Sequence, residues 1–263
     1  MRNSDRPEAT QIVGIVNVTP DSFSGDGIPE QPDLAAQLAV RLVSEGADIV
    51  DVGGQSTRPG STRIPEREEA RRVLPAIEKI AAAVDVPLSV DTARAAMADA
   101  ALKAGARIVN DVSGLSDPEV ATVAARHAAG LILVHNGPVD RTQPIESVRS
   151  GLASLIERSL AAGVRGEKLI VDPGLGFGKD WRANLLILRD LRRLTELGFP
   201  ILVGPSRKGT IGRVLGVGVN DRLEGTIALV TIAIANGASL VRVHDVKAVS
   251  RAARVADAIR SAR

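Results

Sequence analysis

The chain has 263 residues, of which 44% are hydrophobic and 24% charged, a composition ordinary for a globular protein with a full-sized core. Its 33 Lys and Arg against 31 Asp and Glu give a net charge of only +2, and no dense basic run with interleaved aromatic residues is present, so we expect no nucleic-acid partner. The absence of Cys excludes a disulfide framework and thiolate metal sites, and it agrees with a reducing cytoplasm.

Residues 1–11 are polar and contain no apolar signal segment, and no stretch of the chain approaches the ~18 apolar residues of a membrane-spanning helix. We therefore expect a cytoplasmic protein that does not associate with membranes. No linker or change of composition divides residues 12–263, so we expect a short polar tail followed by a single domain.

One unit recurs along the chain: an amphipathic helical stretch, a glycine stop, and a short apolar strand that ends in a polar residue. The glycine stops Gly46, Gly105 and Gly237 are each followed by alanine, and Leu34, Leu38 and Leu42 have helical spacing before the first of them. This pattern predicts eight strands, at residues 12–17, 48–52, 86–91, 107–111, 130–135, 168–172, 200–204 and 239–244.

Eight β/α units in about 250 residues predict a single (β/α)8 TIM barrel, whose strands are buried on both faces and appear as continuous apolar runs. The alternative is an open, doubly wound sheet, but no dinucleotide-binding fingerprint follows the first strand. Residues 19–32 and 53–65 are too long and polar to be simple turns, so we interpret them as active-site loops.

Nearly every predicted strand ends in a polar residue, and in a barrel these ends share one face, where active sites lie. Each residue alone has a structural explanation, since Asp and Asn cap helices, a lysine can be a solvated loop charge, and a histidine can be buried and satisfied. Their convergence nevertheless favours a binding site. The strand-end residues are Asn17, Asp51, Asp91, Asn110, Asp111, His135, Asp172, Lys208, Arg242 and His244.

These side chains fall into two chemical groups. Asp91, Asn110 and Asp172 offer acceptors and an amide donor, which suit a nitrogen-rich ring with several N–H groups. A second group, made of Asn17, Arg58, Arg242 and His244, suits an anion or a metal, and Lys208 lies at the usual phosphate corner of such barrels. With three His and no Cys, zinc is not expected, and an oxygen-rich magnesium site shared with a substrate phosphate fits better.

The stretch LIVDPGLGFGK, residues 169–179, combines a buried strand, the carboxylate of Asp172 and the glycines Gly174, Gly176 and Gly178. Glycine lets the backbone approach a flat or anionic ligand closely. One interpretation is a ligand site. The other is that Asp172 caps the next helix and that the glycines only turn the chain.

Several motifs together resemble the dihydropteroate synthase family, from about Ile12 to the carboxyl end and in the family's order. They are NVTPDSF (17–23), DVGGQSTRPG (51–60), SVDT (89–92), NDVSG (110–114), DPGLGFGK (172–179), SRK (206–208) and RVHDV (242–246). The resemblance implies a TIM barrel that joins dihydropterin pyrophosphate to p-aminobenzoate on the folate pathway, with magnesium and commonly as a homodimer.

By this resemblance, four residues are expected to bind the pterin: Asp91, Asn110, Asp172 and Lys208. Arg242 is expected to stack on the ring and to hold the pyrophosphate with His244 and Asn17, and Asn17 also to meet the magnesium. Thr57 and Arg58 are expected near the pyrophosphate and the p-aminobenzoate, and Phe177 to line the p-aminobenzoate pocket.

The resemblance also implies a dissociative mechanism, in which pyrophosphate leaves first, the site holds a pterin methylene cation, and the arylamine then attacks. Asp91 and Asp172 are expected to stabilise the cation, while Arg242, His244 and the metal stabilise the leaving anion. No nucleophilic Ser or Cys is required.

Four positions depart from the family pattern. Asp26 is displaced by one position in the first loop, and Asn136 replaces an apolar residue of the pterin pocket. Gly209 and Thr210 stand where a serine and a phenylalanine are common, so the p-aminobenzoate half of the site is expected to be altered and the pterin half intact. Two alternatives stay open: a pterin-binding paralogue that is non-catalytic or of altered specificity, and a pterin-binding domain that transfers a methyl group from a methylated folate to a corrinoid protein.

Overall fold

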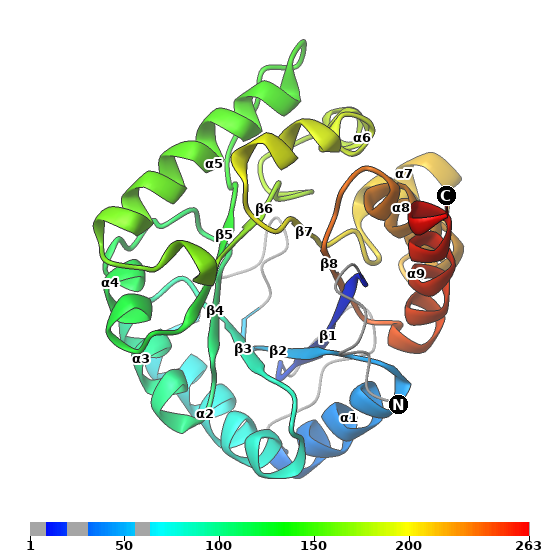
Figure 1. Cartoon of the computed structure of the whole chain (residues 1–263). Coiled ribbons are helices and arrows are strands. Elements are labelled where there is room, and N and C mark those ends of the chain that lie inside the picture. The colour runs from blue at the N-terminus through cyan, green and yellow to red at the C-terminus, as the bar shows by residue number, and fades with distance from the viewer. Residues whose placement is uncertain (1–8, 20–30, 56–63, 263) are drawn as a thin grey trace.

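In the computed structural model, which describes residues 9–19, 31–55 and 64–262, a ring of parallel strands is surrounded by helices (Figure 1). The ladder order is β6-β5-β4-β3-β2-β1-β8-β7, and a bridge between Val171 and Ile201 joins β6 to the chain just before β7. The strands are β1 Gln11–Asn17, β2 Ile49–Gly53, β3 Leu88–Asp91, β4 Ile108–Asp111, β5 Gly130–Val134, β6 Leu169–Asp172, β7 Leu202–Val203 and β8 Leu240–Val243.

Helices connect successive strands and cover the outside of the ring (Figure 1). The α-helices are α1 Pro32–Glu45, α2 Glu66–Ala83, α3 Ala95–Ala104, α4 Glu119–Arg126, α5 Pro144–Ala161, α6 Trp181–Arg189, α7 Gly209–Leu215, α8 Leu223–Ala235 and α9 Val246–Ser261, and the 3₁₀ helices are η2 Gly166–Lys168 and η3 Leu191–Leu197. Helix α1 shows how a unit turns, because Gly46 adopts a φ of 110°, which ends the helix and directs the chain into β2.

These observations confirm the (β/α)8 TIM barrel. All eight strands lie where the sequence pattern predicts them, with ends that differ by at most two residues. The doubly wound alternative is wrong, because β1 pairs with both β2 and β8 and the ring is closed between β6 and β7. Strand β1 begins at Gln11, and the polar tail expected before it lies mostly outside the described residues. No helix in the described ranges is both long and apolar enough to cross a membrane.

The hydrophobic core has two parts, because successive side chains of a strand point to opposite faces. The larger part fills the space between strands and helices. The smaller part lines the inside of the ring, and its buried members are Val13, Ile49, Ile108, Ile132, Val134, Leu202 and Leu240. Two residues further along the same strands, on the same face, stand polar residues such as Asp51, Asn110 and Arg242. The interior is therefore apolar at its base and polar at its carboxyl-end mouth, which is where barrels of this kind have their active sites.

Candidate active site

Arg242 connects two carboxylates from neighbouring strands at the barrel mouth. Its Nε donates to Asp51 Oδ2 at 2.6 Å and its Nη2 donates to Asp91 Oδ2 at 3.0 Å, so one guanidinium on β8 joins β2 and β3. Both carboxylates are buried, with Asp51 fully inaccessible and Asp91 only 7% exposed. A guanidinium presents its N–H groups in a rigid plane, so Arg242 fixes the positions of the two carboxylates relative to each other as well as attracting them. The three side chains thus form a fixed polar floor.

Burial raises the pKa of Asp91 to about 7, and the nearby carboxylates of Asp51, Glu69 and Asp111 add to this effect while Arg242 opposes it. The physical reason is that one guanidinium cannot neutralise two buried carboxylates, so the cluster binds a proton readily. Asp91 therefore changes charge near neutral pH. A positively charged ligand group at the mouth favours its ionised form.

Two buried oxygen atoms in this cluster lack a hydrogen-bond partner among the described residues: Asp51 Oδ1 and Asn110 Oδ1. The amide nitrogen of Asn110 is engaged, since it donates to Asp51 Oδ2 at 3.3 Å. Unsatisfied buried acceptors are uncommon in folded proteins and call for an explanation. A ligand with ring N–H groups at the mouth would offer the kind of donor that Asn110 Oδ1 lacks.

Asp172 ends β6 and accepts a hydrogen bond at 2.7 Å from the backbone N–H of Gly174. Burial raises the pKa of its carboxyl group, and the Gly174 bond and the charges of Lys208 and Lys179 oppose that rise. The helix-cap interpretation of Asp172 is wrong, because α6 is capped by Asp180, whose carboxylate accepts from Ala183 N. Asp172 instead holds the first turn of the glycine-rich stretch.

The glycine-rich stretch packs too tightly for side chains at its first position. Gly174 has a φ of 67°, and a Cβ there would lie 1.9 Å from the carbonyl oxygen of His135. This compact turn brings Phe177 beneath Lys208, whose Nζ lies 4.6 Å from the ring centroid. Lys208 Nζ also donates to Leu175 O at 2.7 Å. The sequence predicts Lys208 for the pterin and Phe177 for the p-aminobenzoate pocket, and in the structure the two side chains are in contact.

Lys179 is a structural residue of this turn and is not among the residues that the sequence predicts for the site. Its Nζ donates to three backbone carbonyls, those of His135 at 2.9 Å, Gly174 at 3.0 Å and Phe177 at 2.8 Å. Burial lowers the pKa of this ammonium to about 8, with Asp172 opposing the shift. The signal was present as the end of the motif GFGK, but a lysine after glycines is also typical of a solvated loop.

The loops after β7 and β8 are tied together beside the mouth. Ser206 Oγ lies 2.9 Å from His244 Nδ1 and accepts from His244 N at 3.2 Å. In the next positions, Arg207 Nη2 donates to Asp245 Oδ1 at 2.8 Å. These contacts hold His244 in the corner where the sequence pattern predicts an anion site. Ser206 belongs to the SRK motif, but the sequence predicts no role for it.

Two members of the strand-end set point away from the mouth. Asp111 follows Asn110 and so occupies the opposite face of β4, where its carboxylate accepts from Ser113 N at 3.1 Å and from Ser113 Oγ at 2.6 Å. His135 packs against α5, since a Cβ on Gly151 would lie 2.5 Å from its ring. Burial lowers the pKa of His135 to about 4, which keeps it neutral. Both are structural.

The remaining predicted residues concern the anion and the metal. Asn17 ends β1 beside Gly53 and is half-buried. Thr57 and Arg58 lie outside the described residues, as does Asp26. Within the described ranges, no group of three or more His, Cys, Asp or Glu is placed to hold a metal. The amide oxygen of Asn17 is a hard ligand, so the residues present fit a magnesium ion that takes most of its ligands from a phosphate and water.

The sequence pattern of the pterin binding enzyme family matches residues 13–244. A dihydropteroate synthase from Bacillus subtilis is 44% identical over 96% of this chain and 89% of its own length. The chain belongs to the dihydropteroate synthase family. A crystal structure of this family's member from Clostridium difficile, obtained in the presence of pteroic acid, is 46% identical and superimposes with a TM-score of 0.91, covering 97% of this chain and 98% of that one.

A second dihydropteroate synthase structure, from Xanthomonas albilineans with 4-aminobenzoic acid, is 40% identical with a TM-score of 0.91 and covers 97% of this chain and 95% of that one.

Three described positions depart from this family's usual pattern. Asn136 is exposed and donates to Val112 O at 2.7 Å, so it ties two loops together. Thr210 is buried, and its hydroxyl accepts from Asn184 Nδ2 at 3.0 Å. A Cβ added to Gly209 meets nothing within 4 Å, so the family's serine fits there.

Proposed function

We propose that the chain catalyses the condensation of 6-hydroxymethyl-7,8-dihydropterin pyrophosphate with p-aminobenzoate, which yields 7,8-dihydropteroate and pyrophosphate in folate biosynthesis. The observation that carries this proposal is the buried cluster of Arg242, Asp51, Asp91 and Asn110, with its unpartnered acceptors at the mouth of the barrel. It combines acceptors for ring N–H groups with a cation. Membership of the dihydropteroate synthase family supports the synthase over a corrinoid methyltransferase.

The pterin ring is assigned to the acceptor side of the mouth. Asp91, Asn110 and Asp172 come from β3, β4 and β6 and accept from the N–H groups of the ring, and Lys208 covers the same region from the loop after β7. The free acceptor of Asn110 supports this assignment. Arg242 offers the planar face of its guanidinium, which suits stacking on a flat ring.

The pyrophosphate is assigned to the opposite side, where Asn17, Arg242 and His244 end β1 and β8. Thr57 and Arg58 are proposed to extend this anion site. Asn17 would hold a magnesium ion there, and the ion would supply positive charge to the leaving group. We propose Asn17 as the protein ligand of this magnesium ion, because its amide oxygen is a hard ligand of the kind that magnesium prefers.

The reaction breaks the bond between the pterin methylene carbon and the pyrophosphate oxygen and forms a bond from that carbon to the amine nitrogen, which then loses a proton to water. Positive charge develops on the pterin as pyrophosphate departs. Asp91 and Asp172 are fixed near the ring by Arg242 and Gly174, so their charge stabilises the cation without reorganisation. Phe177 and the glycine-rich turn are proposed to line the p-aminobenzoate pocket.

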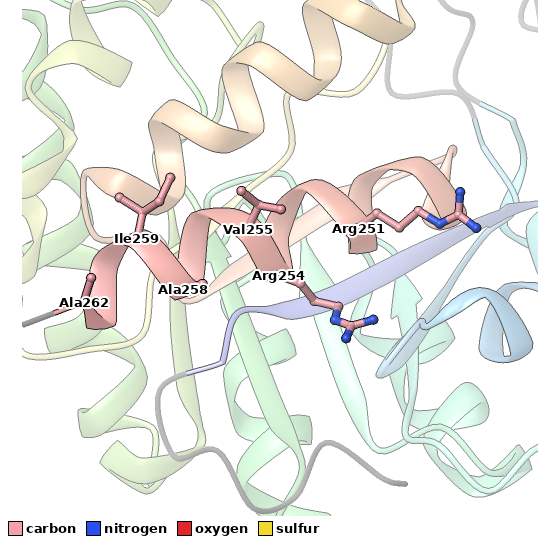
Figure 2. Close-up of a pocket in the computed structure, with 6 residues that line it drawn as sticks. All are labelled: Arg251, Arg254, Val255, Ala258, Ile259 and Ala262. Carbon is pink, nitrogen blue, oxygen red and sulfur yellow. The ribbon is translucent and has the colours of Figure 1, made fainter.

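A homodimer is part of this proposal. Helix α9 presents a shallow depression on its outer face (Figure 2), lined by Arg251, Arg254, Val255, Ala258, Ile259 and Ala262. Ile259 is 70% exposed, and Ile232 on the neighbouring helix α8 is 46% exposed. Exposed apolar side chains on adjacent helices favour burial against a second copy of the chain. The cytoplasmic location expected from the sequence stays a prediction.

The decisive experiment incubates the purified chain with dihydropterin pyrophosphate, magnesium and p-aminobenzoate and follows dihydropteroate and pyrophosphate. We expect both products in equal amounts and dependence on magnesium. Tight binding of dihydropterin pyrophosphate without product would overturn the synthase and leave the non-catalytic paralogue. Sedimentation of the chain and of an Ile259→Asp variant tests the dimer, which the substitution should dissociate.

A further inference from the structure

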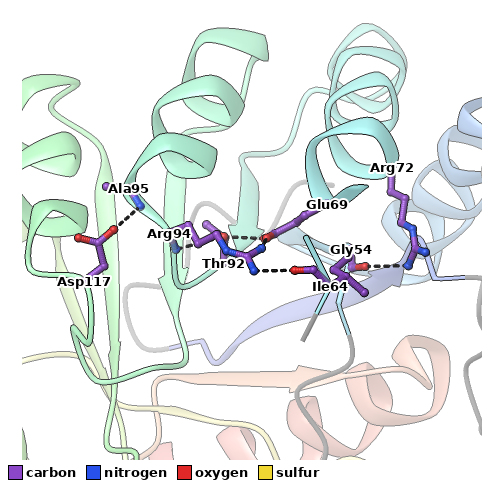
Figure 3. A network of polar contacts seen from close by, with 8 residues as sticks. All are labelled: Gly54, Ile64, Glu69, Arg72, Thr92, Arg94, Ala95 and Asp117. Atoms are coloured by element: carbon purple, nitrogen blue, oxygen red, sulfur yellow. Dashed lines mark hydrogen bonds and ion pairs between the residues drawn. The ribbon is translucent and has the colours of Figure 1, made fainter. Parts of the chain in front are cut away.

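A buried polar network lies behind the end of β3, and the proposed reaction does not use it (Figure 3). Glu69, in the first turn of α2, accepts from Thr92 Oγ1 at 2.7 Å and forms an ion pair with Arg94. Arg94 Nη2 also donates to the carbonyl oxygen of Ile64 at 2.6 Å. The Glu69 side chain is only 4% exposed, so its charge depends on these partners.

A network of this kind is a poor device for stability alone. Removing two charges from water costs several kcal/mol per ion, and well-packed apolar side chains of the same volume are often equally stable or better. The ion pair instead fixes the relative positions of the groups that it joins. The guanidinium of Arg94 is a rigid fork, and it holds a carboxylate of α2 and a backbone carbonyl at the same time.

Both attachment points of the network lie next to the proposed active site. Thr92 directly follows Asp91, and its backbone N–H donates to Asn110 O at 3.2 Å, so Glu69 anchors the end of β3. Ile64 is the residue where the chain returns from positions 56–63, which include Thr57 and Arg58. The network therefore joins a ring-binding strand end to the flank of a proposed anion-binding loop.

The other flank of positions 56–63 is attached to the same helix. A Cβ on Gly54 would lie 2.4 Å from Val73 Cγ2 of α2, so the backbone there packs directly on the helix. Arg72 Nη1 reaches Gly54 O at 3.5 Å (Figure 3). Next to Arg94, the N–H of Ala95 is held by Asp117 Oδ2 at 2.9 Å, which fixes the start of α3. Gly54 therefore packs on α2, while Ile64, just before α2, is held by Arg94. Arg94 also pairs with Glu69 of α2 and so connects both segments to the end of β3.

We propose that Glu69 and Arg94 are positioning residues for the condensation, which together set the end of β3 and the carbonyl of Ile64 relative to each other. This inference rests on the proposed function, because the groups they position are those assigned to the substrates. Neither side chain is assigned a contact with substrate. Their loss misplaces the groups around the reacting carbon, and displacements of ~1 Å are known to cost up to about 100-fold in rate.

The network also acts on Asp91 through its charge. The charged groups that act on the pKa of Asp91 are Arg242 on β8, Asp51 on β2, Glu69 on α2 and, from the opposite face of β4, Asp111. Glu69→Gln removes a negative charge and leaves Arg94 unpaired, so it favours the ionised form of Asp91. Arg94→Gln leaves the charge of Glu69 uncompensated and acts in the opposite direction.

The test measures kcat/KM for dihydropterin pyrophosphate against pH for the parent chain, Glu69→Gln, Arg94→Gln and Arg94→Lys. Lys79→Gln is the matched control, because it removes an exposed ion pair with Asp33 from the same helix. We expect a loss of about 10-fold in kcat/KM for the three network variants. The acidic limb of the profile should move to lower pH in Glu69→Gln and to higher pH in Arg94→Gln.

Arg94→Lys separates position from charge. It keeps the positive charge, so its acidic limb should match the parent, but an ammonium cannot span Glu69 and Ile64 O as the fork does, so its kcat/KM should stay low. A kcat/KM within about twofold of the parent in Arg94→Lys, or limbs that move in the same direction in both Gln variants, overturns the inference.

Two further readouts keep the test independent of folding and of the proposed function. Amide hydrogen exchange of residues 64–69 should be faster in Arg94→Lys than in the parent, with unchanged exchange at Ile77 and Ile80, and equal exchange at residues 64–69 contradicts the inference. If the parent itself forms no dihydropteroate, the proposed function fails. In that case the pH dependence of 6-hydroxymethylpterin binding reports the shifts of Asp91, and the exchange result still decides the positioning role.

Discussion

Arg242 Nε donates to Asp51 Oδ2 at 2.6 Å, across 191 positions of sequence, and this bond closes the floor of the barrel mouth between β8 and β2. Asp51 lies one layer deeper than Asp91 on the same side of the sheet, since it pairs with Ser89 while Gly53 pairs with Asp91. Asp51 is therefore the support on which Arg242 rests, and Asp91 is the partner closer to the mouth.

Asp51→Asn should destabilise the protein by roughly 3 kcal/mol, because Asp51 is the carboxylate closer to Arg242, at 2.6 Å against 3.0 Å for Asp91, and its loss leaves the guanidinium with only the partner whose pKa is raised. The same change removes a carboxylate that raises the pKa of Asp91, so the acidic limb of the kcat/KM profile should move to lower pH. Chemical denaturation and pH–rate profiles measure the two effects. Asp33→Asn, in an exposed ion pair, is the control, and an unmoved limb in Asp51→Asn would contradict the electrostatic account.

Asp91→Asn should stabilise the protein without ligand while reducing kcat/KM about 100-fold. Burial raises the pKa of Asp91 from 3.8 to about 7, so the folded protein binds an extra proton between these pH values and this carboxyl lowers the free energy of unfolding as pH rises through that range. The melting temperature of Asp91→Asn should therefore exceed that of the parent by a few degrees, on the order of 1–2 kcal/mol, at pH 8.

The pH dependence supplies the check on that prediction. At pH 5 the parent Asp91 is protonated and resembles the amide, so the difference in melting temperature should nearly vanish. A variant less stable than the parent at pH 8 refutes the idea that two carboxylates compete for one guanidinium.

Lys179→Met should weaken p-aminobenzoate use more than pterin binding. The substitution removes donors from the carbonyls of His135, Gly174 and Phe177, and Phe177 is proposed to line the p-aminobenzoate pocket. We expect a rise of about 10-fold in KM for p-aminobenzoate, and a loss of stability of about 1–3 kcal/mol for buried carbonyls left unpaired. Steady-state kinetics and thermal melting test this, with the exposed Lys247→Met as control. An unchanged KM would assign Lys179 to stability alone.

Two glycine substitutions should have opposite outcomes. Gly209→Ser adds a side chain where a Cβ meets nothing within 4 Å, so pterin binding and stability should be unchanged and only the KM for p-aminobenzoate should respond. Gly174→Ala places a Cβ 1.9 Å from His135 O at a φ of 67°, so the turn must move and pterin binding should be lost. Titration with 6-hydroxymethylpterin distinguishes the two, and retained affinity in Gly174→Ala would show that the turn does not shape the pterin site.

The sequence predicts the barrel and most of the mouth because both depend on local patterns. Buried strands are continuous apolar runs, and their ends are marked by polar residues such as Asp91 and Asp172. The same continuity hides which face a residue occupies. Neighbours such as Asn110 and Asp111 are equivalent as strand-end residues, yet one joins the mouth and the other accepts bonds from the loop that follows it.

The supporting residues could not be predicted, because their roles depend on contacts between distant segments. Glu69 looks like an ordinary acid in the first turn of a helix, where it complements the helix dipole. Its burial against Thr92 and Arg94 follows from how α2 packs beside β3. Lys179 is similar, since its position is fixed by carbonyls from two different loops.

The ring of strands has a seam between β6 and β7, where one bridge between Val171 and Ile201 replaces an extended ladder and β7 itself is 2 residues long. Lys208 spans this seam, because it follows β7 and donates to Leu175, which follows β6. Lys208, which is proposed to bind the pterin, thus also joins the two sides of the seam. Under the proposed function, a pterin that draws this ammonium away from Leu175 would remove a contact across the seam, so one side chain would serve both substrate binding and the joining of β6 to β7.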